Sequence, residues 1–475
     1  MKKLIGTVAV AALLASAAFA ELSFGAWIRT VTAPVASDGE DIMAGWANSW
    51  GSTVRNARIN LNWTSDDEKV GMMFDIYGDG AGGFGSGDYR AGWYKPADWV
   101  KFMVGHIDNG YTMRSDLCLP SWGWLRPANW IEGDEGLTFN LGNADALQIE
   151  LFPVEGLQVL GRLAMPADGG FQDAYKMFEQ STFAVGYTIG NIGTIKAAWN
   201  GSGTRAYKEK GHAAGYLVQL AGDDYYYSSQ TALNADIDAA KAKQANGDEL
   251  SDKETALAAS TAPTLGAWTK EVKKSGEEKY YGDIQVAFDL TAVENLDLTV
   301  GVKISIASDD FKKLGGGNFA LPGTLKSTDK VSEKGMFNTF KGALGASYKI
   351  NDNFKVSASY AIFLVEFYGS NDDVDPMHQF GVGVEVGLTD SLGLGVDFRG
   401  LLPCNDIDPI FSFVVGLDYN FSSNGMLGIG FQGVIAGANY PAVGENGNPA
   451  RTASVFPARP DKFSWAVPIR FSYWF

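Results

Sequence analysis

Hydrophobic and polar residues alternate one by one through many short stretches of this chain. In residues 354–362, Phe354, Val356 and Tyr360 share one parity, while Lys355 and Ser357 share the other. A period of two places successive side chains on opposite faces of a β-strand. The same pattern predicts strands at 22–29, 56–63, 296–306, 379–389 and 411–419. We therefore expect an all-β protein whose strands have one apolar and one polar face.

The links between the predicted strands fall into two length classes. Tight polar turns at 66–68, 351–353, 389–391 and 422–425 alternate with much longer segments. A soluble β-sandwich also shows alternating strands, but tight turns at one end and long loops at the other are typical of a transmembrane antiparallel β-barrel. Candidate strands number about 18, within a range of about 16–20. Between residues 143 and 215 the order of short and long links breaks down, so we expect one strand there to be missed or split.

The polar face of the predicted strands carries charges of both signs among many Gly and Ser residues. Such a face suits the water-filled lumen of a wide barrel. The candidates for side chains that line this lumen are Arg29, Arg58, Asp75, Lys101, Arg162, Asp289, Lys303, Asp397 and Arg399.

The two ends of the sequence carry export signals. Lys2 and Lys3 precede an apolar run at 4–14, and small residues follow, which predicts a signal peptide at 1–20 with cleavage before Glu21. Residues 21–475 then form a single barrel domain. In the last strand, 463–475, aromatic and aliphatic residues alternate with small or polar ones up to Phe475. This strand resembles the C-terminal recognition signal of outer-membrane barrels.

Together, the signal peptide, the alternating strands and the aromatic last strand resemble the outer-membrane porin superfamily, of bacterial or spirochaete type. The resemblance implies a channel in the bacterial outer membrane for passive diffusion of small hydrophilic solutes and ions. It also implies contacts with outer-membrane lipid, recognition of the C-terminal strand by the barrel-assembly machinery, and a homotrimer. A surface-exposed structural or adhesin barrel that acts through its extracellular loops is the alternative.

In porins the third extracellular loop folds inward and narrows the lumen, and the long loop at 107–136 is similar by position. If it folds in, its carboxylates would face wall cations such as Arg29, Arg58 and Lys101 and create a transverse field. The other interpretation is an outward loop with solvated charges. The candidate carboxylates of this constriction loop are Asp108, Asp116, Glu132, Asp134 and Glu135.

The same loop contains clustered aromatic residues. Such rings stack on sugars, which makes a sugar-selective porin a minor alternative, and they equally suit loop packing or an interfacial belt. The aromatic residues concerned are Tyr111, Trp122, Trp124 and Trp130.

Residues 223–280 interrupt the strand pattern with a polar, Ala-rich segment. Residues 233–259 predict two helices broken at 246–248, and Ser251 with Glu254 forms a capping-box signature for the second. We expect an insertion in an extracellular loop. It is either a solvated decoration or an element for partner recognition or closure of the pore.

Composition adds constraints. The 58 glycines and 13% aromatic residues suit many short strands, and the formal charge of −17 argues against nucleic acid as a partner and for mild cation selectivity. Cys118 and Cys404 either pair in a disulfide or stay unpaired, and the sequence does not decide between the two. The histidines, His106, His212 and His378, stand in no recognisable catalytic signature, so we expect neither an enzyme nor a cofactor or metal.

Overall fold

The computed structural model describes most of the predicted barrel. The described residues are 20–47, 57–78, 84–108, 113–115, 139–165, 177, 180–201, 215–220, 223–227, 230–259, 266–268, 281–307, 336–367, 374–403, 408–438, 459 and 461–475. Both cysteines and the predicted signal peptide, apart from Ala20, lie outside these residues.

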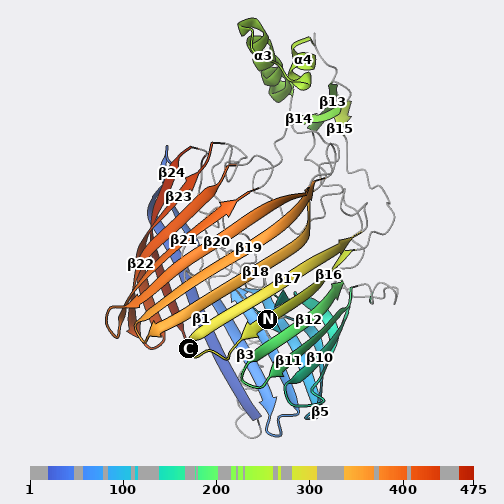
Figure 1. The fold of residues 1–475 in the computed structure, drawn as a ribbon, viewed down its shortest axis with the longest axis vertical. Helices are drawn as coiled ribbons and strands as arrows, with labels where there is room; N and C mark the ends of the chain where they lie inside the picture. The colour runs from blue at the N-terminus through green and yellow to red at the C-terminus, as the bar shows by residue number, and fades with distance from the viewer. Residues whose placement is uncertain are drawn as a thin grey trace, which may run out of the picture.

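The main sheet is antiparallel and closes on itself (Figure 1). Its strands, as far as the chain is described, are β1 (Ala20–Ser37), β2 (Ile42–Ala47), β3 (Ala57–Ser65), β4 (Val70–Gly78), β5 (Phe84–Ala97), β6 (Val100–Ile107), β9 (Ala144–Leu151), β10 (Leu157–Ala164), β11 (Thr182–Ile189), β12 (Gly193–Gly201), β16 (Tyr281–Leu290), β17 (Leu296–Ala307), β18 (Met336–Asn351), β19 (Phe354–Phe367), β20 (Val374–Gly387), β21 (Leu392–Leu402), β22 (Ile410–Ser422), β23 (Gly425–Ala436) and β24 (Phe463–Trp474).

Two of these strands share one position in the barrel wall. β3 pairs with residues 20–28 of β1, and β2 pairs with residues 31–37 of the same strand. The described part of the sheet therefore has 18 strand positions, and the pairing of β1 with β24 closes it. The predicted closed antiparallel barrel of about 18 strands is confirmed.

Short and long connections alternate around the whole barrel. β9 and β10 are joined by residues 152–156 and β11 and β12 by 190–192, whereas 165–181 and 202–280 are the longer connections between and after these pairs. The broken order of links in the sequence interpretation of this region is therefore not a property of the fold. Because the sequence pattern there is weak, the order emerges only from the pairing of β9, β10, β11, β12 and β16.

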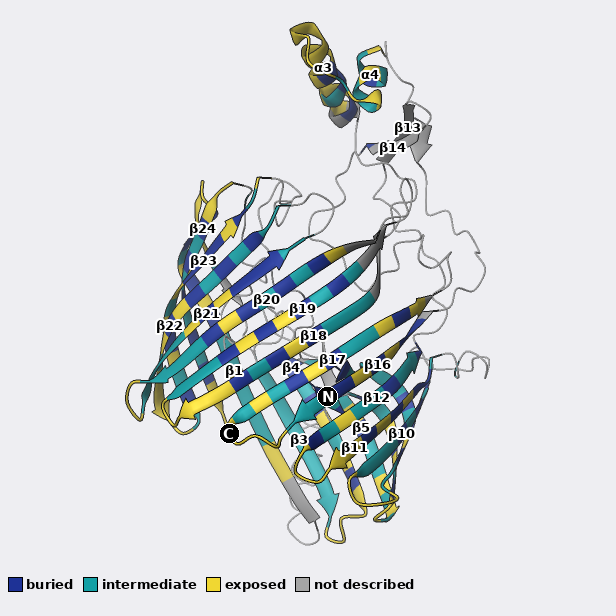
Figure 2. Cartoon of the chain, viewed as in Figure 1, coloured by how far each residue is buried: buried dark blue, intermediate teal, exposed yellow. Residues whose placement is uncertain are grey.

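The outward face of the barrel is apolar and exposed. Figure 2 shows bands of buried and exposed residues alternating along the strands, as a pleated wall requires. Aliphatic side chains such as Val382, Val415 and Ile429 are exposed at mid-strand. Aromatic rings also lie on this outward face, in two clusters. In the first cluster, the stacked rings of Phe398 and Phe411 have centres 6.0 Å apart. The second cluster, near the tight turns, contains Phe421, Phe471 and Tyr473.

An ion-paired network holds the seam where β1 meets β24. Arg459 Nε donates to Asp38 Oδ2 at 2.6 Å and its Nη1 to Glu40 Oε2 at 2.7 Å, while Ser464 Oγ donates to the Asp38 carbonyl at 3.1 Å. Burial acts to raise the pKa of Asp38. The backbone N–H groups of Asp41 and Glu40, together with Arg459, outweigh this effect and lower the pKa.

The insertion forms a small unit beyond the end of the barrel that carries the long connections (Figure 1). It contains β13 (Gly215–Leu220), β14 (Asp223–Tyr227), β15 (Gly266–Trp268), α3 (Gln230–Asn246) and α4 (Asp252–Ala259). Because β13 pairs with β14 and β15, this unit begins before the predicted start at Asp223. Buried Tyr227, Leu233, Ile237 and Leu257 form its own core. Neither helix has the length and apolar character needed to span a bilayer.

The predicted capping box is present at the start of α4. Glu254 Oε2 accepts from the Ser251 N–H at 2.9 Å, and Ser251 Oγ accepts from the Glu254 N–H at 3.3 Å. A hydrogen bond from Lys243, followed by those from Ser251, lowers the pKa of Glu254 to about 2. Lys243 lies in α3, so this carboxylate links the two helices.

Candidate functional site

The inward face of the barrel wall is polar. In β19, Ser357 and Ser359 are 5% and 8% exposed, whereas the neighbouring Tyr360 on the outward face is 43% exposed. The parity that looks polar in the sequence is thus the one that points inside. Other buried polar side chains of this face are Gln148, Thr182, Gln285, Thr299, Ser347, Gln379, Ser412, Gln432 and Ser472.

The candidate lumen residues all project from strands of this wall. Alternation along each strand places them on the inward parity, together with the buried polar residues. They are Arg29 on β1, Arg58 on β3, Asp75 on β4, Lys101 on β6, Arg162 on β10, Asp289 on β16, Lys303 on β17, and Asp397 and Arg399 on β21.

Two short paired strands of the long connection after β6, which together we call the hairpin, lie against this inner wall. They are β7 (Arg114–Ser115) and β8 (Phe139–Asn140). The Asn140 N–H donates to Gln285 Oε1 at 2.8 Å, and Gln285 Nε2 donates to the Asn140 carbonyl at 2.8 Å. Gln285 is fully buried on the inward face of β16, so the hairpin is held inside the barrel.

Charged side chains of the wall hold the other strand of the hairpin. Lys196 Nζ lies 2.8 Å from Asp289 Oδ2 and donates to the Arg114 carbonyl at 2.5 Å. Ser115 Oγ donates to the same Asp289 oxygen at 2.9 Å, and Thr299 Oγ1 donates to the other at 3.0 Å. The Asp289 carboxylate therefore links three wall strands to β7.

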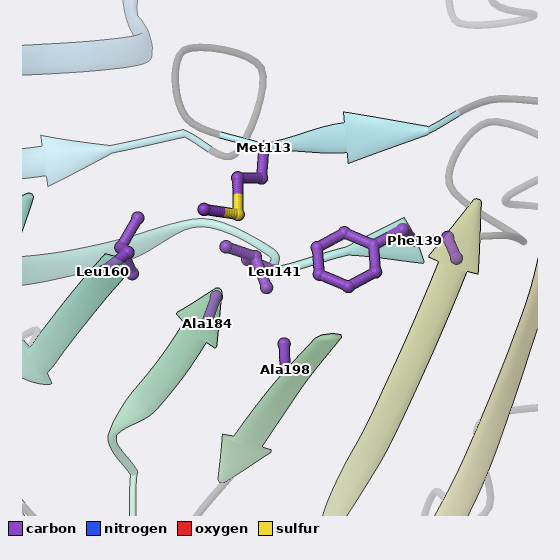
Figure 3. Packing of buried hydrophobic residues seen from close by; sticks show 7 residues of the cluster. Met113, Phe139, Leu141, Leu160, Ala184 and Ala198 are labelled. Atoms are coloured by element: carbon purple, nitrogen blue, oxygen red, sulfur yellow. The ribbon is translucent and has the colours of Figure 1, made fainter. Parts of the chain in front are cut away.

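Apolar side chains complete this contact (Figure 3). Phe139 is fully buried, which stabilises the docked hairpin by about 1.5–3 kcal/mol relative to an exposed ring. Met113 lies over Gly186 of β11. A Cβ atom added at Gly186 would be 3.4 Å from the Cε atom of Met113. The full cluster joins hairpin-side Met113, Phe139 and Leu141 to inward Leu160, Ala184, Ala198 and Ala287.

Arg162 sits at the base of the hairpin. Its Nε donates to Gln148 Oε1 at 2.8 Å and its Nη1 to the Gly142 carbonyl at 2.9 Å. Gln148 in turn donates to Glu150 Oε1 at 2.6 Å. The carboxylates that act electrostatically on Arg162 are those of Asp108 and Glu150. Asp108 is the first residue after β6, at the start of the long loop.

Arg58 has a different environment. Its guanidinium pairs with Asp75 and lies over two rings, 5.1 Å from the centre of Tyr77 and 5.0 Å from that of Tyr89. Asp75 also accepts from the Tyr89 N–H at 2.9 Å. Arg29 lies over the Trp27 ring at 4.9 Å, and Lys101 lies over the Trp93 ring at 5.4 Å. All these contacts of Arg29, Arg58 and Lys101 are with side chains of the barrel wall. The carboxylate of Asp108, at the start of the long loop, acts on Arg162.

Two further ion pairs lie on strands β21 to β24, which lead up to the seam with β1. Arg399 Nε donates to Asp397 Oδ1 at 2.9 Å, and both side chains are buried. Arg470 makes two contacts with Asp418, one of them from Nε to Oδ1 at 2.7 Å. Gly428 stands between these partners in the register and leaves room for them to meet. Each of these cations is therefore neutralised locally by a carboxylate beside it.

Several charged residues of the inner wall were not among the sequence candidates. Lys196, Glu150 and Lys341 lie on weakly patterned strands. Arg470 and Asp418 follow the polar parity of strongly patterned strands, so parity was the signal that could have found them.

Part of the predicted loop chemistry lies outside the described residues: Asp116, Glu132, Asp134 and Glu135 of the candidate constriction loop, with the aromatic Tyr111, Trp122, Trp124 and Trp130.

The described histidines lie on the outward face. His106 Nδ1 is 3.1 Å from Asp145 Oδ1, and His378 Nδ1 is 2.7 Å from the Tyr360 hydroxyl. His212 lies outside the described residues. Within the part of the chain that the structure describes, no group of three or more His, Cys, Asp or Glu side chains is placed to hold a metal ion.

The closed sheet, its apolar outward face and its polar inward face define the class of this protein. It is a transmembrane β-barrel of the bacterial outer membrane, because single-chain barrels with an even number of antiparallel strands and this distribution of side chains belong to that membrane.

Comparison with known proteins finds only weak structural likenesses. No protein-family model matches the sequence, and no curated protein matches it significantly. Among solved structures, OmpT of Vibrio cholerae in its trimer form is 11% identical, with 96% of this chain and 99% of that chain covered and a TM-score of 0.43. The DcaP channel of Acinetobacter baumannii is 10% identical, with 96% and 97% covered and a TM-score of 0.44. The anion-selective porin from Comamonas acidovorans is 10% identical, with 96% and 100% covered and a TM-score of 0.42.

Proposed function

We propose that the protein is an outer-membrane porin, a water-filled channel for passive diffusion of small hydrophilic solutes and ions. The observation that carries this proposal is a polar, charged inward face inside a barrel of 18 strand positions. Barrels of 16–18 strands are wide enough to leave an aqueous channel.

Recording of single-channel current tests this proposal. Residues 21–475 are refolded in detergent and added to a planar lipid bilayer. We expect large, stable, ohmic current steps. Silence from correctly folded, heat-modifiable protein would contradict a diffusion channel.

We also propose that the long connection after β6 narrows the channel. Support comes from the hairpin β7–β8, which is held on the inner wall through Gln285 and Asp289, and from the action of Asp108 on Arg162. Because most described wall cations have a carboxylate partner, we expect only weak discrimination between ions. The net acidity of the chain then gives a mild preference for cations, measured as a reversal potential in a salt gradient.

Three further proposals concern export and assembly. Residues 1–20 are a signal peptide, which predicts Glu21 as the first residue of the exported protein. The last strand recruits the barrel-assembly machinery, so removal of Phe475 should slow insertion in cells. The barrel forms a homotrimer, which mass measurement in detergent tests.

Sugar selectivity by the loop aromatics stays a minor proposal, contradicted if maltose-type oligosaccharides fail to block the current.

A surface barrel that acts through its loops is the second candidate function. The insertion supports it, because residues 215–268 contain helices and strands with a core of their own. This candidate predicts a folded barrel with little conductance and a binding activity that is lost with the insertion.

A further inference from the structure

Two lysines stand side by side on the inner wall beside the docked hairpin. Lys303 of β17 and Lys341 of β18 are directly opposite each other in the strand register, and both are on the inward parity. The neighbour of Lys303 on the other side is Gln285, which holds the hairpin strand β8. The pair therefore lies beside the residue that holds β8 on the wall.

No carboxylate neutralises this pair within 4.0 Å, as far as the chain is described. Lys341 has one described contact, with the Phe363 ring, whose centre is 5.9 Å from Nζ. The carboxylate of Asp283 acts electrostatically on Lys341 and also accepts a hydrogen bond from Gln285 Nε2 at 2.5 Å. Like charges directly opposite each other destabilise a sheet, so the pair has a cost that packing does not explain.

Among the described residues, other cations of the inner wall, unlike Lys303 and Lys341, form ion pairs with carboxylates. Lys196, Arg399 and Arg470 each have a carboxylate partner. A second lysine pair lies opposite in register on the next strand pair, Lys349 of β18 and Lys355 of β19. There Lys349 Nζ is 3.0 Å from Asp352 and Lys355 Nζ is 3.4 Å from Glu385.

We propose that Lys303 and Lys341 form an oxyanion-binding step in the channel, where the two ammonium groups together bind a doubly charged phosphate or dicarboxylate solute in transit. This inference rests on the proposed channel function. Two adjacent ammonium groups match the charge of a dianion, and lysine is a common binder of phosphate. Both side chains are half-buried, which weakens screening by salt relative to a fully exposed site.

The test measures block of single-channel current by inorganic phosphate and, separately, by succinate. Both probes should reduce the chloride-carried current of the wild-type channel in a saturable way. In Lys303→Gln/Lys341→Gln the half-blocking concentration should rise about tenfold or more, as expected when charge-assisted hydrogen bonds are lost. The reversal potential should also shift towards cations. Block by only one probe assigns the site to that class of oxyanion.

The matched control is Lys349→Gln/Lys355→Gln, which removes the same formal charge from a neutralised pair. It should leave block by either probe close to wild type, whereas Lys303→Arg/Lys341→Arg should retain it. Removal of like charges relieves repulsion, so the test variant is expected to fold. Equal effects of the two Gln double variants, or wild-type channels without saturable block, would overturn the inference while leaving the channel intact. Absence of any conductance in the wild type contradicts the proposed function itself.

Discussion

At the scale of single residues, the seam network depends on Arg459. This side chain is the cation shared by Asp38 and Glu40, and Asp38 is fully buried. Arg459→Gln leaves the Asp38 carboxylate with its backbone donors alone. We expect a loss of about 1–2 kcal/mol in the free energy of unfolding, measured by urea titration in detergent. Lys462→Gln, which removes an exposed cation 3.7 Å from Glu40, is the control and should have little effect.

The same network predicts a dependence on pH. The pKa of Asp38 is lower in the folded protein than its ordinary value, so the folded state favours the ionised form. Its stabilising contribution is fully present above the ordinary pKa of an aspartate and is lost as the pH falls through the lowered value. Thermal unfolding should therefore shift to lower temperature on acidification, by less in Arg459→Gln than in the wild type. An equal shift in both would contradict this account.

Gly428 is a second residue whose role is local. A methyl group at this position would overlap the Asp418 carboxylate and the Arg470 side chain. We expect Gly428→Ala to lower the free energy of unfolding by about 1–3 kcal/mol. Gly395 is a matched control, because nothing lies within 4 Å of the added atom. Gly395→Ala should be neutral or raise stability by about 0.4–1 kcal/mol.

At the scale of elements, the docked hairpin is held by a few polar side chains. Lys196→Met removes the hydrogen bonds to the Arg114 carbonyl and Ser115 and the ion pair with Asp289. Docking should weaken by about 1.5–3 kcal/mol. We expect the single-channel conductance to increase and the current noise to rise. Lys355→Met, which removes a wall cation without a described hairpin contact, should not change the current noise.

Strands and hairpins differ in how far the sequence predicts them. In β19, β20 and β24 the alternation assigns the faces correctly, because one face contacts lipid and the other polar groups. The capping box of α4 is equally local. The pairing of Asn140 with Gln285 joins residues 145 positions apart, and parity says nothing about which distant residues share a register. For the same reason the sequence includes Lys303 among the candidates but not its partner Lys341.

At the scale of the whole molecule, the insertion should be separable from the barrel. Gly201 and Gly282 are cross-strand neighbours on β12 and β16, so residues 202–280 can be replaced by a short Gly-Ser turn. We expect the shortened chain to refold and conduct like the wild type. A conductance that rises sharply would instead assign the insertion to closure of the pore, and a loss of refolding would contradict its independence.

The pairing of β1 with β24 has a consequence for how the protein is made. The first strand of the wall finds its final partner only in the last, with Ala26 and Phe475 joined by two backbone hydrogen bonds of 2.9 and 3.0 Å. Until β24 is in place, the forming sheet has two unpaired edges, each able to recruit another chain. Because closure depends on contacts of very long sequence separation, it must be slow relative to hairpin formation. During that interval the cell has to keep the chain unaggregated.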